Sequence, residues 1–376
     1  MDTVDAAGLA IGDDHPPRIM GVLNLSRESP YDPSVFDDPG EAAAYVEDTL
    51  VAEGADIVDV GLESANKRFE VLPPEAELER LETAIEVLES VSSDAVFSIE
   101  TRYHEVAEAA LRGGFDMVND VCGFADPAMP AVCAEYDAPV VKMASPPDLE
   151  RPGGVESVEE IYDALAREGF TDKTILDPAF GGWTEDKTLA DDRETFSRLR
   201  EFRALGRPIL VSINRKNFLR DLAGRSTEAA LSVSLAATSM AVERGAHVIR
   251  THDVAETRDA AIVGDAFTKE RVRDDAVGVE ELDVTTTAEL KRHVDRVDGQ
   301  ADPGRGVSRA FLLQGVSPAG RDALAATVEG TALLCAGTAE RIVLAGSVAT
   351  LACVPEPHDA PAPLRAALDR VRKACG

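Results

Sequence analysis

The stretch VFSIETRYHEVAEAALRGGFDMVND, residues 96–120, contains one complete structural unit of the chain. Residues 96–100 form an apolar run that predicts a strand. Residues 104–114 are rich in Ala and Glu and end in glycine, which predicts a helix. Residues 116–120 predict a second strand. A strand, a helix and a strand in this order are typical of a parallel sheet covered by helices.

The same unit recurs along most of the chain. Eight short apolar runs predict strands at 19–24, 56–61, 96–100, 116–120, 138–143, 174–177, 208–213 and 247–252. Ala-, Glu- and Leu-rich segments between them predict helices. Eight such units in about 250 residues predict a (β/α)8 TIM barrel. A doubly wound open sheet is the alternative, but no G-x-G-x-x-G motif follows the first strand, so a dinucleotide site is disfavoured.

The pattern of the chain changes near residue 268. Charged segments and a loop are followed by apolar runs at 309–317, 331–337 and 341–354, and by an amphipathic segment at 364–374. We therefore predict an N-terminal extension at 1–17, a barrel at 18–267 and a smaller C-terminal α/β domain at 268–376.

The composition is strongly acidic, with a formal net charge of −31 and a sequence pI of about 4.5 over 376 residues. A nucleic-acid backbone would be repelled by this charge. The acidic residues are spread along the chain, which favours a solvated surface adapted to high salt, while an acidic surface for a cationic partner is the alternative.

The sequence also bears on the compartment. No apolar run approaches the roughly 18–20 residues of a membrane-spanning helix, and the N-terminus lacks the pattern of a signal peptide. The five cysteines show no C-x-x-C spacing. We expect a cytoplasmic protein that binds neither membrane nor nucleic acid.

Barrel enzymes place their chemistry at the carboxyl ends of the strands. Polar side chains follow all eight predicted strands, and we call this set the polar mouth: Asn24, Glu63, Glu100, Asn119 with Asp120, Lys142, Asp177, Asn214 with Arg215 and Lys216, and Arg250 with His252 and Asp253. Eight polar ends in register are unlikely to arise by chance. The sequence therefore predicts a functional site at this end of the barrel.

The predicted polar mouth has two chemical halves. Asn24, Glu100, Asn119 and Asp177 offer amides and carboxylates, which accept hydrogen bonds from a heterocycle rich in N–H groups. Lys216, Arg250 and a protonatable His252 offer cations, and the planar fork of arginine suits a phosphate or pyrophosphate. The residues thus indicate a substrate with an N–H-rich ring and an anionic tail.

Five stretches together resemble dihydropteroate synthase of the pterin-binding TIM-barrel superfamily: GVLN (21–24), SIETRYHEVAEAALRGGFDMVND (98–120), ILDPAFG (175–181), INRKNF (213–218) and RTHDV (250–254). The resemblance covers about residues 18–265. It implies a folate-pathway transferase that joins 6-hydroxymethyl-7,8-dihydropterin pyrophosphate to p-aminobenzoate and releases pyrophosphate. It also implies a homodimer.

The resemblance assigns a role to each matching residue. Glu100 stands where the family has a pterin-contacting aspartate that is one methylene shorter, and the other pterin-binding positions are Asn119, Asp177 and Lys216. Arg250 and His252 match the pair that binds the pyrophosphate. Asn24 matches the amide that holds Mg²⁺ against it. The catalytic residues implied in this way are Lys216, Arg250 and His252.

The loops of the chain depart from the family pattern. The first loop reads SRESPYDPS (26–34) and the second reads GLESANKRF (61–69), in which Ser64, Lys67 and Arg68 are the candidate contacts of the second substrate. The loop DPAFGGWTEDK (177–187) contains the single tryptophan, Trp183. These changes leave two alternatives open. One is another pterin enzyme, either a methyltransferase with a folate-type donor or a synthase with a different arylamine. The other is a non-catalytic pterin-binding accessory protein.

Overall fold

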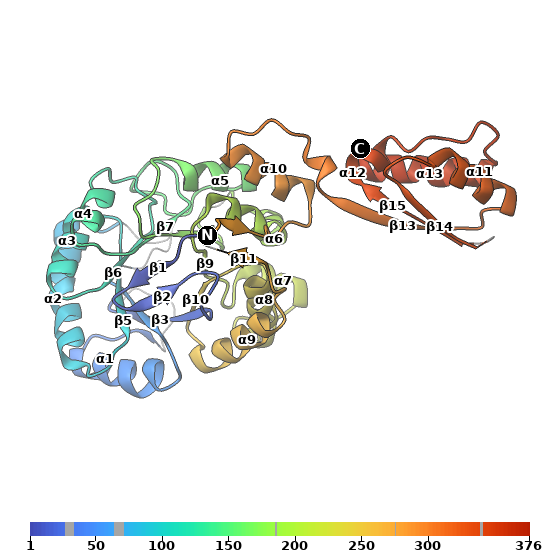
Figure 1. The fold of residues 1–376 in the computed structure, drawn as a ribbon. Helices are drawn as coiled ribbons and strands as arrows, with labels where there is room; N and C mark the ends of the chain where they lie inside the picture. The colour runs from blue at the N-terminus through green and yellow to red at the C-terminus, as the bar shows by residue number, and fades with distance from the viewer. Residues whose placement is uncertain (27–33, 64–70, 185, 275, 339–340) are drawn as a thin grey trace. The chain divides into compact units, whose positions relative to one another are not determined.

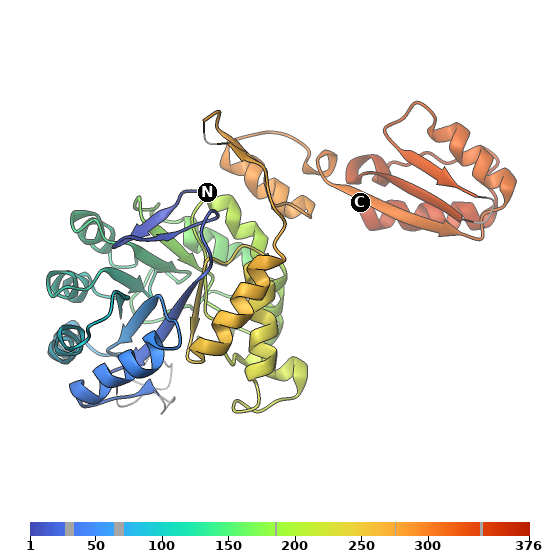
Figure 2. The ribbon, with the colours of Figure 1, turned by 60° about the horizontal axis from the view of Figure 1, so that its bottom comes forward.

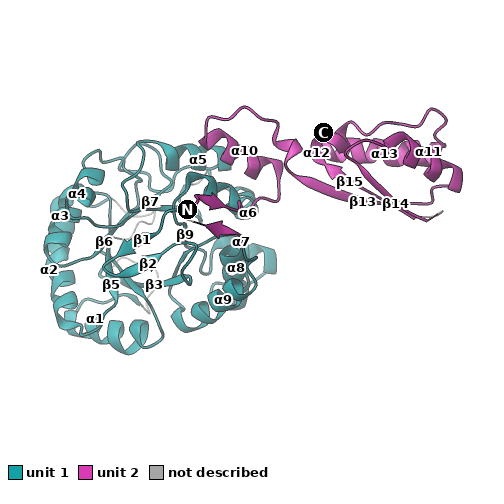
Figure 3. Cartoon of the chain, in the orientation of Figure 1, with its two compact units in different colours: residues 1–270 teal, residues 271–376 magenta. Residues whose placement is uncertain are grey.

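The computed structural model describes residues 1–26, 34–63, 71–184, 186–274, 276–338 and 341–376. The chain divides into two compact units, residues 1–270 and residues 271–376, which are coloured separately in Figure 3. Unit 1 contains the eight strands that the sequence predicts for the barrel. Unit 2 contains the apolar runs of the C-terminal segment.

Unit 1 is a TIM barrel, as predicted (Figure 1). Its eight parallel strands pair in the order β8-β7-β6-β5-β4-β3-β10-β9, and a bridge between Leu176 and Ile209 joins the two outer strands. The strands are β3 (Arg18–Asn24), β4 (Ile57–Gly61), β5 (Val96–Thr101), β6 (Met117–Asp120), β7 (Val140–Met143), β8 (Thr174–Asp177), β9 (Leu210–Val211) and β10 (Val248–Thr251).

Helices cover the outside of the barrel (Figure 1). In α3, the buried residues Val106, Ala107, Ala110 and Leu111 recur with the helical period and join the main core, so the amphipathic pattern in the sequence decides which face packs on the sheet. The helices are α1 (Pro39–Tyr45), which continues into η2 (Val46–Val51), α2 (Pro74–Ser90), α3 (His104–Arg112), α4 (Met129–Glu135), α5 (Val158–Ala166), α6 (Leu189–Ser197) with η3 (Leu199–Leu205), α7 (Asn217–Ala223), α8 (Leu231–Glu243) and α9 (Val254–Ala266).

The N-terminal residues form a hairpin of β1 (Val4–Ala6) and β2 (Leu9–Ile11), drawn in dark blue in Figure 2. Val4, Ala6 and Ile11 of this hairpin are buried in one apolar cluster with residues from all eight barrel strands. These strand residues are Met20, Ile57, Val96, Met117, Val141, Ile175, Leu210 and Val248. The barrel interior is therefore apolar towards the amino ends of its strands, and the polar side chains are left at the carboxyl ends.

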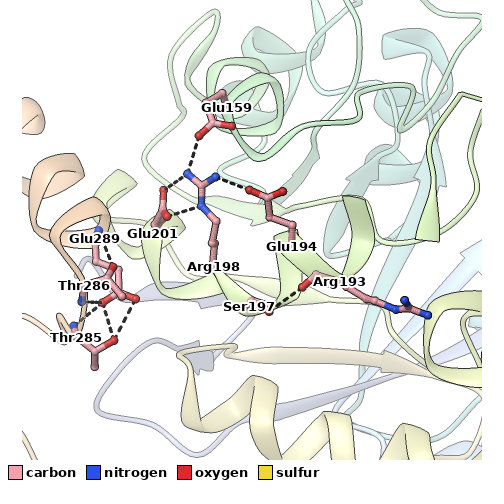
Figure 4. A network of polar contacts seen from close by, with 9 residues as sticks. All are labelled: Glu159, Arg193, Glu194, Ser197, Arg198, Glu201, Thr285, Thr286 and Glu289. Carbon is pink, nitrogen blue, oxygen red and sulfur yellow. Dashed lines mark hydrogen bonds and ion pairs between the residues drawn. The ribbon is translucent and has the colours of Figure 1, made fainter. Parts of the chain in front are cut away.

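The acidic surface of unit 1 includes ion-pair networks that join neighbouring helices. Arg198, at the junction of α6 and η3, donates to Glu159 of α5, Glu194 of α6 and Glu201 of η3 over 2.6–2.9 Å (Figure 4). Glu201 is buried, whereas the other two acids are exposed. One arginine thus compensates three carboxylates, which lowers their mutual repulsion.

Unit 2 contains a three-stranded antiparallel sheet in the order β13-β15-β14, and in Figure 1 the helices α11, α12 and α13 lie along one side of that sheet. Helix α10 begins at a capping box formed by Thr286 and Glu289 (Figure 4). The elements are β11 (Arg273–Asp274), β12 (Val279–Glu280), α10 (Thr287–Arg296), η4 (Pro303–Arg305), β13 (Ser308–Gln314), α11 (Pro318–Val328), β14 (Leu334–Gly337), β15 (Arg341–Ser347), α12 (Val348–Ala352) and α13 (Ala362–Cys375). Within the described residues of both units, every helix is too short or too polar to cross a membrane.

Candidate active site at the carboxyl ends of the barrel strands

Three of the predicted pterin-binding residues lie at the carboxyl ends of strands. Glu100 of β5 and Asn119 of β6 are register partners in the sheet, and Asp177 is the last residue of β8. Asn119 and Asp177 are only 4% and 5% exposed, and Glu100 is partly buried. Neighbouring strands in register present their side chains on the same face, so Glu100 and Asn119 lie side by side.

Arg250 of β10 reaches across the barrel to two carboxylates. Its Nε donates to Oδ2 of Asp59 over 2.7 Å, and its Nη2 donates to Oε2 of Glu100 over 2.7 Å. Asn119 Nδ2 donates to the same oxygen of Asp59 over 2.9 Å. The structure therefore brings a predicted pyrophosphate ligand and two predicted pterin ligands into one hydrogen-bonded network.

Asp59, at the centre of this network, is absent from the predicted site. It lies in the middle of β4 and is fully buried. The sequence does contain a signal, because a carboxylate inside the apolar run IVDVG is rare in strands and costly to bury without a partner. Such a residue is a candidate for an internal charge pair.

Burial shifts the pKa values of three ionisable groups of the polar mouth, Glu100, Asp177 and Lys216. It raises the pKa of Glu100 to about 7, although Arg250 opposes the shift. Burial also raises the pKa of Asp177. Burial and the charge of Arg250 lower the pKa of Lys216 to about 8, so its ammonium group is charged at neutral pH but easily deprotonated.

The expectation of a protonatable His252 is wrong. Burial and the positive charge of Arg250 lower the pKa of His252 to about 3, so the imidazole is neutral at neutral pH. Its Nδ1 lies 3.3 Å from Oγ of Ser34, which in turn accepts a 2.8 Å hydrogen bond from Nδ2 of Asn24. Ser34, in the first divergent loop, is a second site residue that the sequence did not reveal. It links the predicted pyrophosphate and metal residues.

Lys142 does not belong to the polar mouth, contrary to the prediction. Its side chain is fully buried against Phe124 and Phe170, and its ammonium group donates to the backbone carbonyls of Arg167 and Gly169. Side chains alternate between the two faces of a strand, and Lys142 of β7 occupies the face towards the helices. It therefore stabilises the backbone that follows the carboxyl end of α5, and it does not bind a ligand.

Several other residues of the predicted polar mouth are engaged with the protein itself. Asp253 accepts two hydrogen bonds of 2.8 Å from the guanidinium of Arg215 and one from Nδ2 of Asn214. The next residue, Lys216, instead interacts electrostatically with Asp177 and Arg250. Consecutive residues cannot all point to one side of the backbone.

Two further acids of the polar mouth are also bound internally. Glu63 accepts a 2.9 Å hydrogen bond from Arg102, and both side chains are almost completely buried. The carboxylate of Asp120 accepts the backbone N–H groups of Cys122, Gly123 and Phe124 and so holds the turn after β6. Both carboxylates therefore stabilise the backbone where a strand ends and do not serve as ligand contacts.

The second-substrate residues Ser64, Lys67 and Arg68 lie outside the described residues. Trp183 is described, and its ring lies 5.5 Å from the Nζ of Lys216. Its Nε1 donates to the carbonyl of Phe180 over 3.2 Å, and Gly153, with φ of +63°, packs against the ring. A Cβ at position 153 would lie 2.4 Å from the indole, so glycine is required for this contact.

The surroundings of Asn24 fit a hard cation. Its Nδ2 is used by Ser34, which leaves Oδ1 as the acceptor. A Cβ at Gly61 would lie 3.3 Å from this oxygen, 3.9 Å from the carbonyl oxygen of Glu63 and 4.0 Å from Oε1 of Glu100, so glycine keeps open a space that three oxygen atoms face. Oxygen atoms are the ligands that Mg²⁺ takes, together with water and substrate phosphates.

A barrel with this polar mouth defines the class of the protein. Residues 20–252, more than half of the chain, match the family model of pterin binding enzymes, and the chain belongs to this family. Within the family it is similar to dihydropteroate synthases. It is 30% identical to the dihydropteroate synthase of Clostridium beijerinckii over 258 residues, which cover 67% of this chain and 94% of that protein.

Other relatives give the same similarity. A probable bifunctional folylpolyglutamate synthase/dihydropteroate synthase of Halobacterium salinarum is 33% identical over 261 residues, which cover 66% of this chain. The chain matches only 31% of the length of that relative, and 29% of a corresponding protein of Haloferax volcanii. The dihydropteroate synthase of Thermus thermophilus in complex with 4-aminobenzoate aligns with a TM-score of 0.57 and 33% identity, over 70% of this chain and 99% of that one.

Proposed function

We propose that this chain is a dihydropteroate synthase-type transferase. It would join 6-hydroxymethyl-7,8-dihydropterin pyrophosphate to p-aminobenzoate to give 7,8-dihydropteroate and pyrophosphate. The observation that carries the proposal is the contact of Arg250 with Glu100, because it joins an anion-binding group to the residues suited to an N–H-rich ring. Related Thermus thermophilus synthases have been solved with 4-aminobenzoate and with 6HMPPP, which supports both substrates.

The ring of the pterin would be bound by acceptors. Glu100, Asn119 and Asp177 offer carboxylate or amide oxygens at the ends of three strands. Buried carboxylates also stabilise positive charge on a neighbouring ring. They would therefore favour the cationic character that the pterin methylene gains as its bond to pyrophosphate oxygen lengthens.

The pyrophosphate would be bound by Arg250, His252 and Asn24. Arg250 supplies the positive charge, and the neutral His252 supplies a ring nitrogen as a hydrogen-bonding group. A Mg²⁺ ion held by Oδ1 of Asn24 would neutralise the charge of the departing pyrophosphate. These groups would stabilise the leaving group more strongly as its negative charge grows.

The second substrate would approach past Lys216 and Trp183. The arylamine nitrogen would form a bond to the pterin methylene carbon as the carbon–oxygen bond to pyrophosphate breaks, and the nitrogen would then release a proton to solvent. Lys216 interacts electrostatically with Arg250 and Asp177, and its Nζ lies 5.5 Å from the ring of Trp183, which supports a contact with both substrates. Its ammonium group would attract the carboxylate of p-aminobenzoate or hold the pterin.

Product formation is the direct test of the proposed function. Purified chain in high salt with Mg²⁺ is given the dihydropterin pyrophosphate and p-aminobenzoate, and dihydropteroate is measured by chromatography. Turnover supports the transferase. Binding of the pterin without product would refute it and would favour an accessory pterin-binding protein.

Arg250→Lys tests the anion site more cleanly than Arg250→Ala, because alanine would also leave Asp59 and Glu100 without a cation. Lysine keeps the charge but loses the planar fork, so affinity for the pyrophosphate ester should fall by about 10- to 100-fold and affinity for the free pterin alcohol by much less. The matched control is Arg203→Lys, since Arg203 forms a buried pair with Asp13 away from the polar mouth. Equal losses for both ligands would contradict the assignment of Arg250.

A further inference from the structure

Asp59 combines complete burial with an unusual pattern of hydrogen bonds. One oxygen, Oδ2, accepts both from Nδ2 of Asn119 and from Nε of Arg250, which come from β6 and β10. The other oxygen, Oδ1, is buried and has no hydrogen-bond partner among the described residues. Burying a carboxylate costs several kcal/mol, and that cost is offset mainly through the single oxygen that holds two site residues.

We propose that Asp59 is a positioning residue that sets the amide of Asn119, so that Asn119 presents its oxygen and not its nitrogen to the pterin. The inference rests on the proposed function and deepens it. A carboxylate can only accept hydrogen bonds, so the amide atom that faces Asp59 must be Nδ2. The other amide atom, Oδ1, is therefore left for the ligand, where it accepts from a ring N–H or amino group.

The same oxygen restricts Arg250. Asp59 takes the Nε–H group and Glu100 takes one Nη2–H group, and these two groups form one edge of the guanidinium. A guanidinium carries five N–H donors, so Nη1 and the second Nη2–H group form the remaining edge. That edge has the geometry that binds two phosphate oxygens together. Asp59 thus orients Asn119, which would bind the pterin ring. Together with Glu100, it also orients Arg250, which would bind the pyrophosphate.

The chain offers a matched control for Asp59. Ser98 of β5 is the register partner of Asp59, is also fully buried, and its hydroxyl has no hydrogen-bond partner in the described part of the chain. Replacing Ser98 by alanine alters the same layer of the barrel interior without touching Asn119 or Arg250. A general disturbance of this layer would affect both positions, whereas positioning would affect Asp59 alone.

The experiment compares Asp59→Asn, Asn119→Ala, the double variant and Ser98→Ala. An amide at position 59 can offer a donor or an acceptor, so the amide of Asn119 is no longer held in one orientation. Binding of 6-hydroxymethyl-7,8-dihydropterin is measured by the fluorescence of Trp183, the single tryptophan. We expect Asp59→Asn to weaken binding at least about tenfold and Ser98→Ala to change it less than about twofold.

The double variant separates positioning from a general loss of structure. If Asp59 acts through Asn119, adding Asp59→Asn to Asn119→Ala should weaken pterin binding less than about twofold further. The inference would be overturned if the losses of pterin affinity caused by the two single substitutions multiply in the double variant. It would also be overturned if the Asp59→Asn variant binds the pterin normally. Either result would leave the proposed function standing. Absence of pterin binding by the unaltered chain would overturn both.

Discussion

Replacing Glu77 by glutamine should stabilise unit 1 in a strongly pH-dependent way. Glu77 lies on α2 with 1% of its surface exposed and accepts a 2.6 Å hydrogen bond from the hydroxyl of Thr101, next to Glu100. Burial raises the pKa of Glu77 from 4.5 to about 8, although the hydrogen bond from Thr101 opposes the shift. The carboxyl group is therefore mostly protonated in the folded chain at neutral pH.

The sign and size of the effect follow from proton linkage. Between pH 4.5 and about 8, the folded chain keeps a proton on Glu77 that the unfolded chain has released, so stability falls as the pH rises through this range. The free energy of unfolding falls by about 1.4 kcal/mol for each pH unit above 4.5, so Glu77 lowers it by about 3 kcal/mol at pH 7. Glutamine is neutral at every pH and can still accept from Thr101, so Glu77→Gln should recover about 3 kcal/mol at pH 7 and almost nothing at pH 4.

Urea unfolding at pH 4 and pH 7 measures the difference. The fluorescence of Trp183 reports the transition of unit 1 alone, because the chain has one tryptophan and it lies in that unit. Glu79→Gln on the exposed face of α2 is the control and should change stability little at either pH. An equal effect of Glu77→Gln at both pH values, or destabilisation of unit 1 at pH 7, would contradict a protonated Glu77 in the folded chain.

Three further predictions concern particular residues. Because the pKa of Lys216 is about 8, kcat/KM should fall as the pH rises above that value, and Lys216→Arg should move this loss to higher pH in a pH–rate profile. Lys142→Met should cost roughly 1–3 kcal/mol in urea unfolding, since it leaves two backbone carbonyls after α5 without their donor, while pterin affinity stays unchanged. Gly153→Ala should displace the indole of Trp183 and shift its emission spectrum. The same substitution should raise KM for the arylamine more than KM for the pterin. An unaltered emission spectrum would contradict the contact between Gly153 and the indole.

The strands and helices of the barrel were predictable because their signals are local. Each apolar run in the repeated unit supplies a strand, and each amphipathic segment such as 104–112 buries the face that its period specifies. The carboxyl ends of parallel strands meet at one end of the barrel, so Glu100, Asn119, Asp177 and Arg250 could be expected near one another. In the structure, Glu100, Asn119 and Arg250 share one hydrogen-bonded network, and Asp177 interacts electrostatically with Arg250.

The partners of individual side chains could not be predicted in this way. Lys142 and Asp177 both lie near the carboxyl end of a strand, yet Lys142 lies among the outer helices, whereas Asp177 interacts electrostatically with Lys216 and Arg250. The direction of a side chain depends on the register of a strand, and one residue of shift reverses it. The neutral state of His252 depends on burial and on a neighbouring charge, which a sequence does not display.

The sequence by itself determined the class of fold, the end of the barrel that carries polar residues, and the resemblance to a pterin enzyme. The tertiary structure alone decided that Asp59 lies at the centre of the site, where it bonds to Arg250 from 191 residues away in the chain. Glu100, 150 residues from Arg250, joins the same network. The physical reason is that local patterns set the period of each element, whereas a buried charge finds its partner only when barrel closure brings β10 beside β3 and within reach of β4 and β5.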